Sequence, residues 1–232
     1  MKKLGIIGAM SIEVALLKEN MTEMTVENHA GSDFCSGRLE GMDVVVVQCG
    51  VGKVNAAICA QILCSVYGVT HLVNTGIAGS LDASLDIGDL LVSRDAMYHD
   101  FDCVHFGYEM GKVPGMDVVA FPADPCLTEL ALAAVQQVHP GHGKLGRVAS
   151  GDLFVASREA KNLIIARTGA QCTEMEGAAV AQTAHRNGIP FVILRAISDK
   201  ADDSAEMDYP TFEAIAARRC ANVAMNLARQ LA

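Results

Sequence analysis

Short, wholly apolar runs alternate with segments of helical periodicity along most of this 232-residue chain. The runs at 4–9, 72–75 and 191–197 predict strands buried on both faces, because their apolar residues are consecutive rather than alternating. The segments at 54–67 and 125–138 repeat apolar residues at helical spacing and predict helices. This alternation predicts an α/β fold of three layers, αβα, with helices on both faces of a central mixed, twisted sheet.

Turn and capping residues divide the rest of the chain into further elements. Residues 33–48 predict a hairpin that leads into a central strand, and residues 99–116 form a long segment without periodicity. Long irregular segments in compact domains are often functional. A C-terminal helix is expected over about 210–231, with Asp208 as its cap. Because no repeats or linkers occur, residues 1–232 are expected to form a single domain.

The charge balance is acidic, with 18 Lys and Arg against 27 Asp and Glu, for a net charge of −9. No basic cluster occurs, so the sequence argues against nucleic acids and anionic membranes as partners. Eight cysteines are scattered without a CxxC or zinc-ligand spacing, which favours a reducing cytoplasm. No apolar run is long enough to span a membrane, and the basic N-terminus lacks the features of a signal peptide.

Two glycine-rich segments suggest nucleotide-binding loops but lack the required spacing. Residues 5–10 follow a predicted strand without completing GxGxxG, which favours a tight strand-to-helix turn. Residues 50–53 fail as a P-loop, because Val47 replaces the first glycine and Val54 follows the lysine. The backbone amides that open the helix at Gly52 could still face a ligand.

The segment His99-Asp100-Phe101-Asp102 carries residues that could bind a metal. A metal site needs three or four converging ligands, and no partner cluster is visible elsewhere in the sequence. A hydrogen-bonded loop network is therefore favoured, and neither a metal nor another cofactor is expected.

The apolar run that ends at Asp199 is the strongest local sign of function. It runs into Arg195, Ser198 and Asp199, although burying an unpaired charge is very costly. Ligands of α/β sheets bind beyond the carboxyl ends of the strands, so Asp199 stands where a catalytic acid would. A carboxylate that caps the following turn explains the same residue, and both interpretations stay open at this point.

Further carboxylates follow other predicted strands. Glu13 lies in the first turn of a helix, where the helix dipole alone would explain it. Glu174 and Glu176 point apart, so we expect only one to face a site and the other to be solvated or paired. With Arg195 nearby, Glu13, Glu176 and Asp199 suit general acid–base chemistry on a neutral, sugar-like ligand.

Seven short motifs, spread in order over nearly the whole chain, point to one family. They read GIIGAMSIEVALL, CGVGKVNAA, NTGIAGS, YHDFD…FGYE…VPG, SGDLFV, TEMEGAAVA and ILRAISDKAD. The chain resembles the 5′-methylthioadenosine/S-adenosylhomocysteine nucleosidases of the purine nucleoside phosphorylase-like superfamily. The resemblance implies a nucleoside phosphorylase-like fold, a small-molecule nucleoside substrate and no cofactor. It also implies hydrolysis of the N-glycosidic bond of methylthioadenosine and S-adenosylhomocysteine, releasing adenine and a 5-thioribose, and of 5′-deoxyadenosine.

The resemblance further implies a role for each matching residue. Asp199 would protonate or hydrogen-bond N7 of adenine, with support from Ser198. Glu13 would activate the attacking water, in a water network that includes Arg195, and Glu176 would bind the ribose hydroxyls. The other implied substrate contacts are Met175 beside the ribose, Phe154 stacked on adenine, Val155 at the adenine edge, and Met10, Val51, Ile77, Gly79 and Tyr209 around the substrate.

The long loop is implied to act across a homodimer. Phe106 and Pro114 match residues that reach the 5′-substituent pocket of the neighbouring subunit. Cys103 stands where an aliphatic residue is common in that pocket, so the resemblance does not rank methylthioadenosine, S-adenosylhomocysteine, 5′-deoxyadenosine and aminofutalosine-type substrates.

Three other positions depart from the family pattern. Ile77 replaces a small polar residue near the water and removes one hydrogen bond from that network. Tyr209 replaces a common Phe but keeps an aromatic ring, and Lys200 is expected to point away from the site.

Two rival functions make different demands on the sequence. A phosphorylase needs cations beside the first glycine turn, but residues 8–17 contain only Glu13, and Arg94 would act alone. A non-catalytic binding protein would have lost one or more carboxylates, whereas Glu13, Glu176 and Asp199 are all present. An acid at N7 must hold its proton near pH 7, so apolar surroundings are expected to raise the pKa of Asp199.

Overall fold

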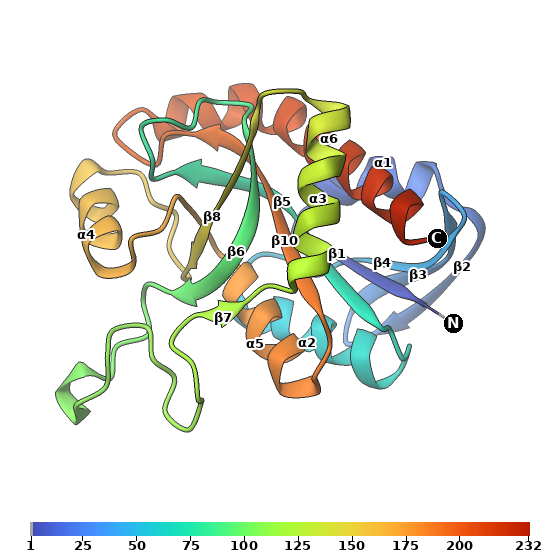
Figure 1. Ribbon diagram of the computed structural model, residues 1–232, viewed down its shortest axis with the longest axis horizontal. Helices are drawn as coiled ribbons and strands as arrows, with labels where there is room; N and C mark the ends of the chain where they lie inside the picture. Colours follow the sequence, from blue (N-terminus) through green and yellow to red (C-terminus); the bar gives the residue numbers. More distant parts are fainter. Residues whose placement is uncertain (1) are drawn as a thin grey trace.

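Ten strands form one mixed sheet in the part of the chain described by the computed structural model, residues 2–232 without the side chains of Glu206 and Met207 (Figure 1). The strands are β1 (Leu4–Gly8), β2 (Thr22–His29), β3 (Ser32–Leu39), β4 (Met42–Gln48), β5 (His71–Ser80), β6 (Leu90–Tyr98), β7 (Phe121–Pro122), β8 (Gly143–Ser150), β9 (Cys172–Glu174) and β10 (Phe191–Asp199). The helices are α1 (Ser11–Glu19), α2 (Lys53–Ser65), α3 (Pro125–Val138), α4 (Arg158–Thr168), α5 (Gly177–Asn187) and α6 (Ala205–Leu231), with a 3-10 turn at Val104–Phe106.

The strand pairings make the sheet partly closed. Strands β4, β1, β5 and β10 are parallel, and β3 and β2 continue the sheet antiparallel beyond β4. On the other side, β10 pairs with β6, β6 with β8, and β8 with β9. Strand β9 then pairs with β5, which closes these strands into a ring. Closure brings the carboxyl ends of β5, β9 and β10 close together.

Helices cover both faces of the sheet, which confirms the predicted three-layer fold (Figure 1). Neighbouring strand residues belong to opposite clusters of buried apolar side chains. Ile7 and Ile193 pack on the side of α2 and α5, whereas Ile6 and Val192 pack on the side of α1, α3 and α6. This explains why the strands are wholly apolar rather than alternating.

Two helix ends carry the residue types that favour helix boundaries. Asp124 accepts a hydrogen bond from the backbone N–H of Leu127 at 2.8 Å, and Pro125 begins α3. Gly188 ends α5 with a φ of 65°, a left-handed conformation that glycine adopts without steric cost.

Three elements differ from the predicted ones. The polar strand β2 was not predicted. It pairs with β3 at the edge of the sheet and buries none of its residues, so it has no apolar pattern. Strand β5 continues to Ser80 through small residues that sequence patterns assign to a turn. Helix α6 begins before Pro210, and Asp208 lies in its first turn, where its side chain accepts a hydrogen bond from Ser204 at 2.7 Å.

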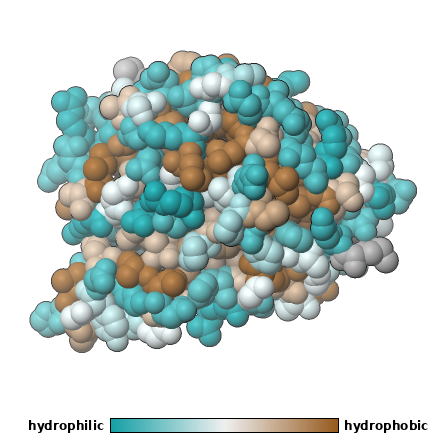
Figure 2. All heavy atoms as spheres, viewed as in Figure 1, coloured by the Kyte–Doolittle hydropathy of each residue, from teal (hydrophilic) through white to brown (hydrophobic). Residues whose placement is uncertain are grey.

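The face of the molecule drawn in Figure 2 is predominantly polar, with apolar patches between the polar areas. Residues 99–118 extend away from the body of the protein as a long loop (green in Figure 1). Phe106 in this loop is 78% exposed. Within the residues that the structure describes, no helix has the length and apolar character that a membrane crossing requires.

Candidate active site

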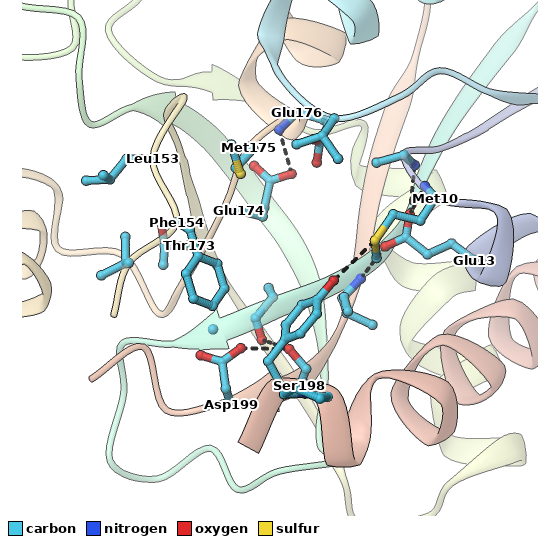
Figure 3. A pocket seen from close by; sticks show the side chains of 18 residues that line it. Met10, Glu13, Leu153, Phe154, Thr173, Glu174, Met175, Glu176, Ser198 and Asp199 are labelled. Carbon is cyan, nitrogen blue, oxygen red and sulfur yellow. Dashed lines mark hydrogen bonds between the residues drawn. The ribbon is translucent and has the colours of Figure 1, made fainter. Parts of the chain in front are cut away.

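A cavity of about 480 Å³ lies where α1 begins and where β5, β9 and β10 end. Side chains from these elements point into it from several sides (Figure 3). The structure therefore brings together the three strand-end carboxylates that the sequence singled out. The lining residues are Ala9, Met10, Glu13, Val51, Ile77, Ala78, Gly79, Leu153, Phe154, Val155, Thr173, Glu174, Met175, Glu176, Ser198, Asp199, Tyr209 and Pro210.

Asp199, the last residue of β10, lies at one end of the cavity beside Ser198 (Figure 3). Its Oδ2 accepts a hydrogen bond from the Ser198 hydroxyl at 2.8 Å, and its Oδ1 accepts one from the backbone N–H of Ala201 at 2.7 Å. Only 3% of Asp199 is exposed, and burial raises the pKa of its carboxyl group, as predicted. Asp199 thus both caps the following turn and faces the cavity.

Aromatic side chains lie next to this carboxyl group. Phe154 follows β8, and its ring meets that of Tyr209 edge to face with 5.6 Å between the centroids. The Tyr209 hydroxyl contacts the sulfur of Met10 at 3.2 Å, and Val155 is buried beside Phe154. This apolar end of the cavity suits a flat ring with polar atoms at its edge.

Glu13 is held by backbone N–H groups of the β1–α1 turn and of β5. Its Oε2 accepts hydrogen bonds from the N–H groups of Ala9 at 2.7 Å and Met10 at 3.0 Å, and its Oε1 accepts one from Ile77 at 3.0 Å. The bond to Met10 is a helix-capping contact in the first turn of α1, as expected for a carboxylate there, and Glu13 also lines the cavity. Burial raises the pKa of Glu13, although Arg195 and these amides act in the opposite direction.

Arg195 lies behind the cavity and neutralises the carboxylates on that side. It is 1% exposed, forms a buried ion pair with Glu174 and donates a hydrogen bond to Asn74 at 2.6 Å. Its Nη2 lies 3.8 Å from Glu176. Gly76 is paired with Arg195 in the sheet, and a Cβ at Gly76 would overlap both the guanidinium group and Glu13. The glycine therefore permits this close approach.

Glu174 is paired, as predicted for one of the two glutamates, but both Glu174 and Glu176 line the cavity. Glu174 is paired, because it also accepts hydrogen bonds from the backbone N–H groups of Glu176 at 3.1 Å and of Gly177 at 2.7 Å. Both side chains line the cavity, however, so the expectation that only one faces a site was wrong. Burial, followed by the Glu174 charge, raises the pKa of Glu176 to about 7.

The backbone amides at the start of α2 bind carboxylates of the protein itself. Gly52 donates to Glu176 at 2.8 Å, and Lys53 donates to Asp152 at 2.9 Å. The Lys53 ammonium group pairs with Asp100 at 2.6 Å, so Asp100 belongs to a loop network of the kind predicted. The expectation that these amides could face a ligand was wrong, because the folded chain supplies their acceptors.

Some predicted residues lie outside this cavity. Cys103, Phe106 and Pro114 are in the long loop and do not line it. Their assignment to the 5′ pocket of a neighbouring subunit stays a prediction. Arg195 does not line the cavity either, because it is buried and pairs with Glu174 and Glu176, which do line it.

Asn74 and Gly76 are functional neighbours that the sequence reasoning missed. Both belong to the NTGIAGS motif, in which the family resemblance implies roles for Ile77 and Gly79 only. Their importance comes from the alignment of β5 with β10, because Gly76 pairs directly with Arg195. Without that register, a short polar residue and a glycine on a strand carry no distinctive signal.

Comparison with known proteins agrees with this geometry. The sequence model of the Phosphorylase superfamily matches residues 3–229. The 5′-methylthioadenosine/S-adenosylhomocysteine nucleosidase of Staphylococcus aureus is 43% identical to this chain, and the match covers 90% of this chain and 91% of the relative. The nucleosidase of the same name from Staphylococcus carnosus is 39% identical, and the match covers 98% of this chain and 100% of the relative. The crystal structure of such a nucleosidase from Colwellia psychrerythraea, in complex with adenine, superimposes with a TM-score of 0.95 at 39% identity, covering 99% of this chain and 96% of its own. The chain belongs to the Phosphorylase superfamily and, within it, to the 5′-methylthioadenosine/S-adenosylhomocysteine nucleosidases.

Proposed function

We propose that this protein hydrolyses the N-glycosidic bond of 5′-methylthioadenosine and S-adenosylhomocysteine, and also of 5′-deoxyadenosine. The proposal rests on the two ends of the cavity. At one end lies a buried carboxyl group that contacts no cation among the described residues, and at the other lie carboxyl groups held by backbone amides and by an arginine. Breaking this bond requires a proton for the departing adenine and a nucleophile for the ribosyl cation. The two ends of the cavity supply these in turn.

Asp199 acts on the leaving group. Adenine fits beside Phe154 and Val155 with N7 towards the Asp199 carboxyl group, which donates its proton as the C1′–N9 bond breaks. Burial raises the pKa of Asp199, which supports a carboxyl group that still holds a proton when the nucleoside binds. Ser198 and the Ala201 amide fix its orientation.

Glu13 acts on the nucleophile. A water held by its carboxylate attacks C1′ and gives Glu13 a proton, while the negative charge of the carboxylate stabilises the ribosyl cation. Three backbone N–H groups hold the Glu13 oxygens without supplying a mobile proton. Glu176 and Met175 bind the ribose, and the unpaired, buried Nε of Arg195 supports the proposal that this arginine contributes to the water network.

A phosphorylase of the same fold is the rival. A phosphate nucleophile would need cationic side chains in the cavity, and no lysine or arginine appears among its described lining residues. Arg94 is on β6, with its side chain 55% exposed and 3.3 Å from Asp95. Glu13 and Glu176 would repel the phosphate.

The long loop supports a homodimer as the active form. Phe106 and Pro114 would complete the 5′-substituent pocket of the neighbouring copy, which explains why they do not line the cavity of their own chain. The exposure of Phe106 in isolation is consistent with burial against a partner. Eight free cysteines favour a reducing cytoplasm as the location.

Product analysis distinguishes hydrolysis from phosphorolysis. Methylthioadenosine is incubated with the protein in buffer with and without phosphate, and adenine and the sugar product are separated by chromatography. Hydrolysis predicts equal rates and free 5-methylthioribose in both buffers. Adenine release that requires phosphate, with a sugar 1-phosphate as product, would overturn the proposal.

A further inference from the structure

The hydrogen bonds around Asp199 continue into helix α4 through a lysine that the reaction above does not use. The Lys161 ammonium group donates a hydrogen bond to the carbonyl oxygen of Lys200. The same peptide unit carries the N–H of Ala201, which donates to Oδ1 of Asp199 at 2.7 Å. A cation on the carbonyl and a carboxylate on the N–H polarise one peptide unit in the same direction, which strengthens both bonds.

The turn that contains this peptide unit is not the conformation that the chain would adopt alone. Ala201 has a φ of 50°, in the left-handed region that residues with side chains rarely occupy. Lys161 also pairs with Asp202 at 3.7 Å, so it contacts the turn on both sides of Ala201. Gly79 leaves space for the Ala201 methyl group, because a Cβ there would lie 2.8 Å from it.

Lys161 is well placed to hold this turn. Its side chain is only 16% exposed. Lys200 cannot substitute for it, because its ammonium group points away from the cavity, as predicted, and binds the carbonyl of Leu85 at 2.6 Å and Asp86 at 2.9 Å.

We propose that Lys161 is a positioning residue for the acid-catalysed step, which holds the Asp199 carboxyl group in place and favours its ionised form through the peptide unit 200–201. The proposal rests on the function proposed above. It explains how a residue on α4, outside the cavity, acts on the leaving-group end of the reaction.

The other groups around Asp199 set the direction of the expected change. Burial raises the pKa of Asp199, the Ser198 hydroxyl and the Ala201 amide oppose that rise, and the charges of Asp208 on α6 and Asp202 in the turn add to it. Tyr209 on α6 has its pKa raised to about 12 and stays neutral. Removing Lys161 weakens the Ala201 bond and frees the Asp202 charge, so the pKa of Asp199 should rise further.

The test compares Lys161→Met with Arg158→Met. Arg158 is a matched control, because it is on the same helix and pairs at 3.8 Å with Asp203 of the same turn. Two readouts follow Asp199: the alkaline limb of kcat/KM for methylthioadenosine, and a ¹³C NMR titration of the carboxyl carbon, assigned with Asp199→Asn. In Lys161→Met we expect both to move to higher pH by about 0.5–1 unit.

The activity at pH 7 should also fall in Lys161→Met, by about tenfold. The reason is that Asp199 becomes an anion as it gives up its proton, and the Ala201 hydrogen bond to that anion is weaker in the variant. Arg158→Met should match the wild type in both readouts. Lys161→Arg keeps a cation at this position and should stay close to the wild type. If Lys161→Met does not fold, Lys161→Gln is used, and its neutral donor should give a smaller shift in the same direction.

The outcomes separate this inference from the proposed function. An Asp199 titration in Lys161→Met that coincides with the wild type, or an equal shift in Arg158→Met, overturns the role of Lys161 while leaving hydrolysis intact. A wild-type protein that releases no adenine would contradict the proposed function, and the NMR titration would still test the link between Lys161 and Asp199.

Discussion

The two ends of the cavity hold carboxyl groups in different electrostatic surroundings. At the leaving-group end, Asp199 accepts hydrogen bonds from a hydroxyl and one amide, and no cation contacts it among the described residues. At the sugar end, Glu174 and Glu176 share the buried Arg195. There Glu13 accepts hydrogen bonds from three backbone N–H groups, and the charge of the same arginine lowers its pKa.

The groups that surround each carboxyl group, rather than the residue type, therefore decide whether it acts as an acid or as a base. Burial raises the pKa of Asp199 and of Glu13 alike, yet only Glu13 has a cation and several amides that favour its charged form. Acid and base on one cavity are commonly separated in this way. Replacing the arginine, displacing a carboxyl group and titrating the sugar end each test whether the two ends differ in this way.

The largest effect on folding is expected from Arg195→Met. The substitution leaves Glu174 buried without its cation, and the free energy of unfolding should fall by about 3–5 kcal/mol. Urea denaturation measures it, with Arg94→Met as the control, because Arg94 is exposed and its partner Asp95 also binds Arg147 at 2.6 Å. The control should change stability by no more than about 0.5 kcal/mol. Equal losses in the two variants would show that the sugar end needs no buried cation.

Gly79→Ala tests the leaving-group end by displacement. The added Cβ would lie 2.8 Å from Oδ1 of Asp199 and 2.8 Å from the Cβ of Ala201, so the turn that holds the carboxyl group must shift. We expect kcat/KM for methylthioadenosine to fall about 10²-fold, as for a misplacement of roughly 1 Å. Gly76→Ala is the matched variant, because its Cβ would overlap Arg195 and Glu13 instead. Wild-type activity in Gly79→Ala would contradict the requirement for a tightly positioned Asp199 carboxyl group.

The smallest effect concerns the pH dependence of stability at the sugar end. The pKa of Glu176 is about 7 in the folded protein against 4.5 for an ordinary Glu. The folded state therefore binds more protons than the unfolded state between these values, and stability falls as pH rises through 7. Urea denaturation should show lower stability at pH 8 than at pH 5.5, and Glu176→Gln should remove about 2 kcal/mol of that difference. The same pH dependence in wild type and variant would refute this origin.

The sequence predicted the layers, most of the elements and the three carboxylates, because each depends on local patterns. Consecutive apolar residues mark strands such as β10 whatever lies beside them. Asp199 could be singled out because a charge at the end of such a run is expensive to bury. The family resemblance then supplied roles that these patterns alone left open.

What the sequence could not predict depends on which strands are neighbours. The pairing of Gly76 with Arg195 and the ion pair with Glu174 join residues that are far apart in the chain. The continuation of β5 through Gly76–Ser80 contradicts local propensity and follows from its pairing with β10 and β9. The link from Lys161 to Asp199 likewise requires the turn geometry at Ala201.

Substrates with different leaving groups test whether Asp199 acts on the leaving group and Glu13 on the attacking water. We would measure kcat/KM for methylthioadenosine and for a 4-nitrophenyl riboside with the same 5-methylthio group, using wild type, Asp199→Asn and Glu13→Gln. Asp199→Asn should lose at least about 10² on the nucleoside and recover most of it on the nitrophenyl substrate, whose leaving group departs without a proton. Glu13→Gln should lose activity on both substrates. An equal loss on both substrates in Asp199→Asn would contradict its role as the acid for the leaving group.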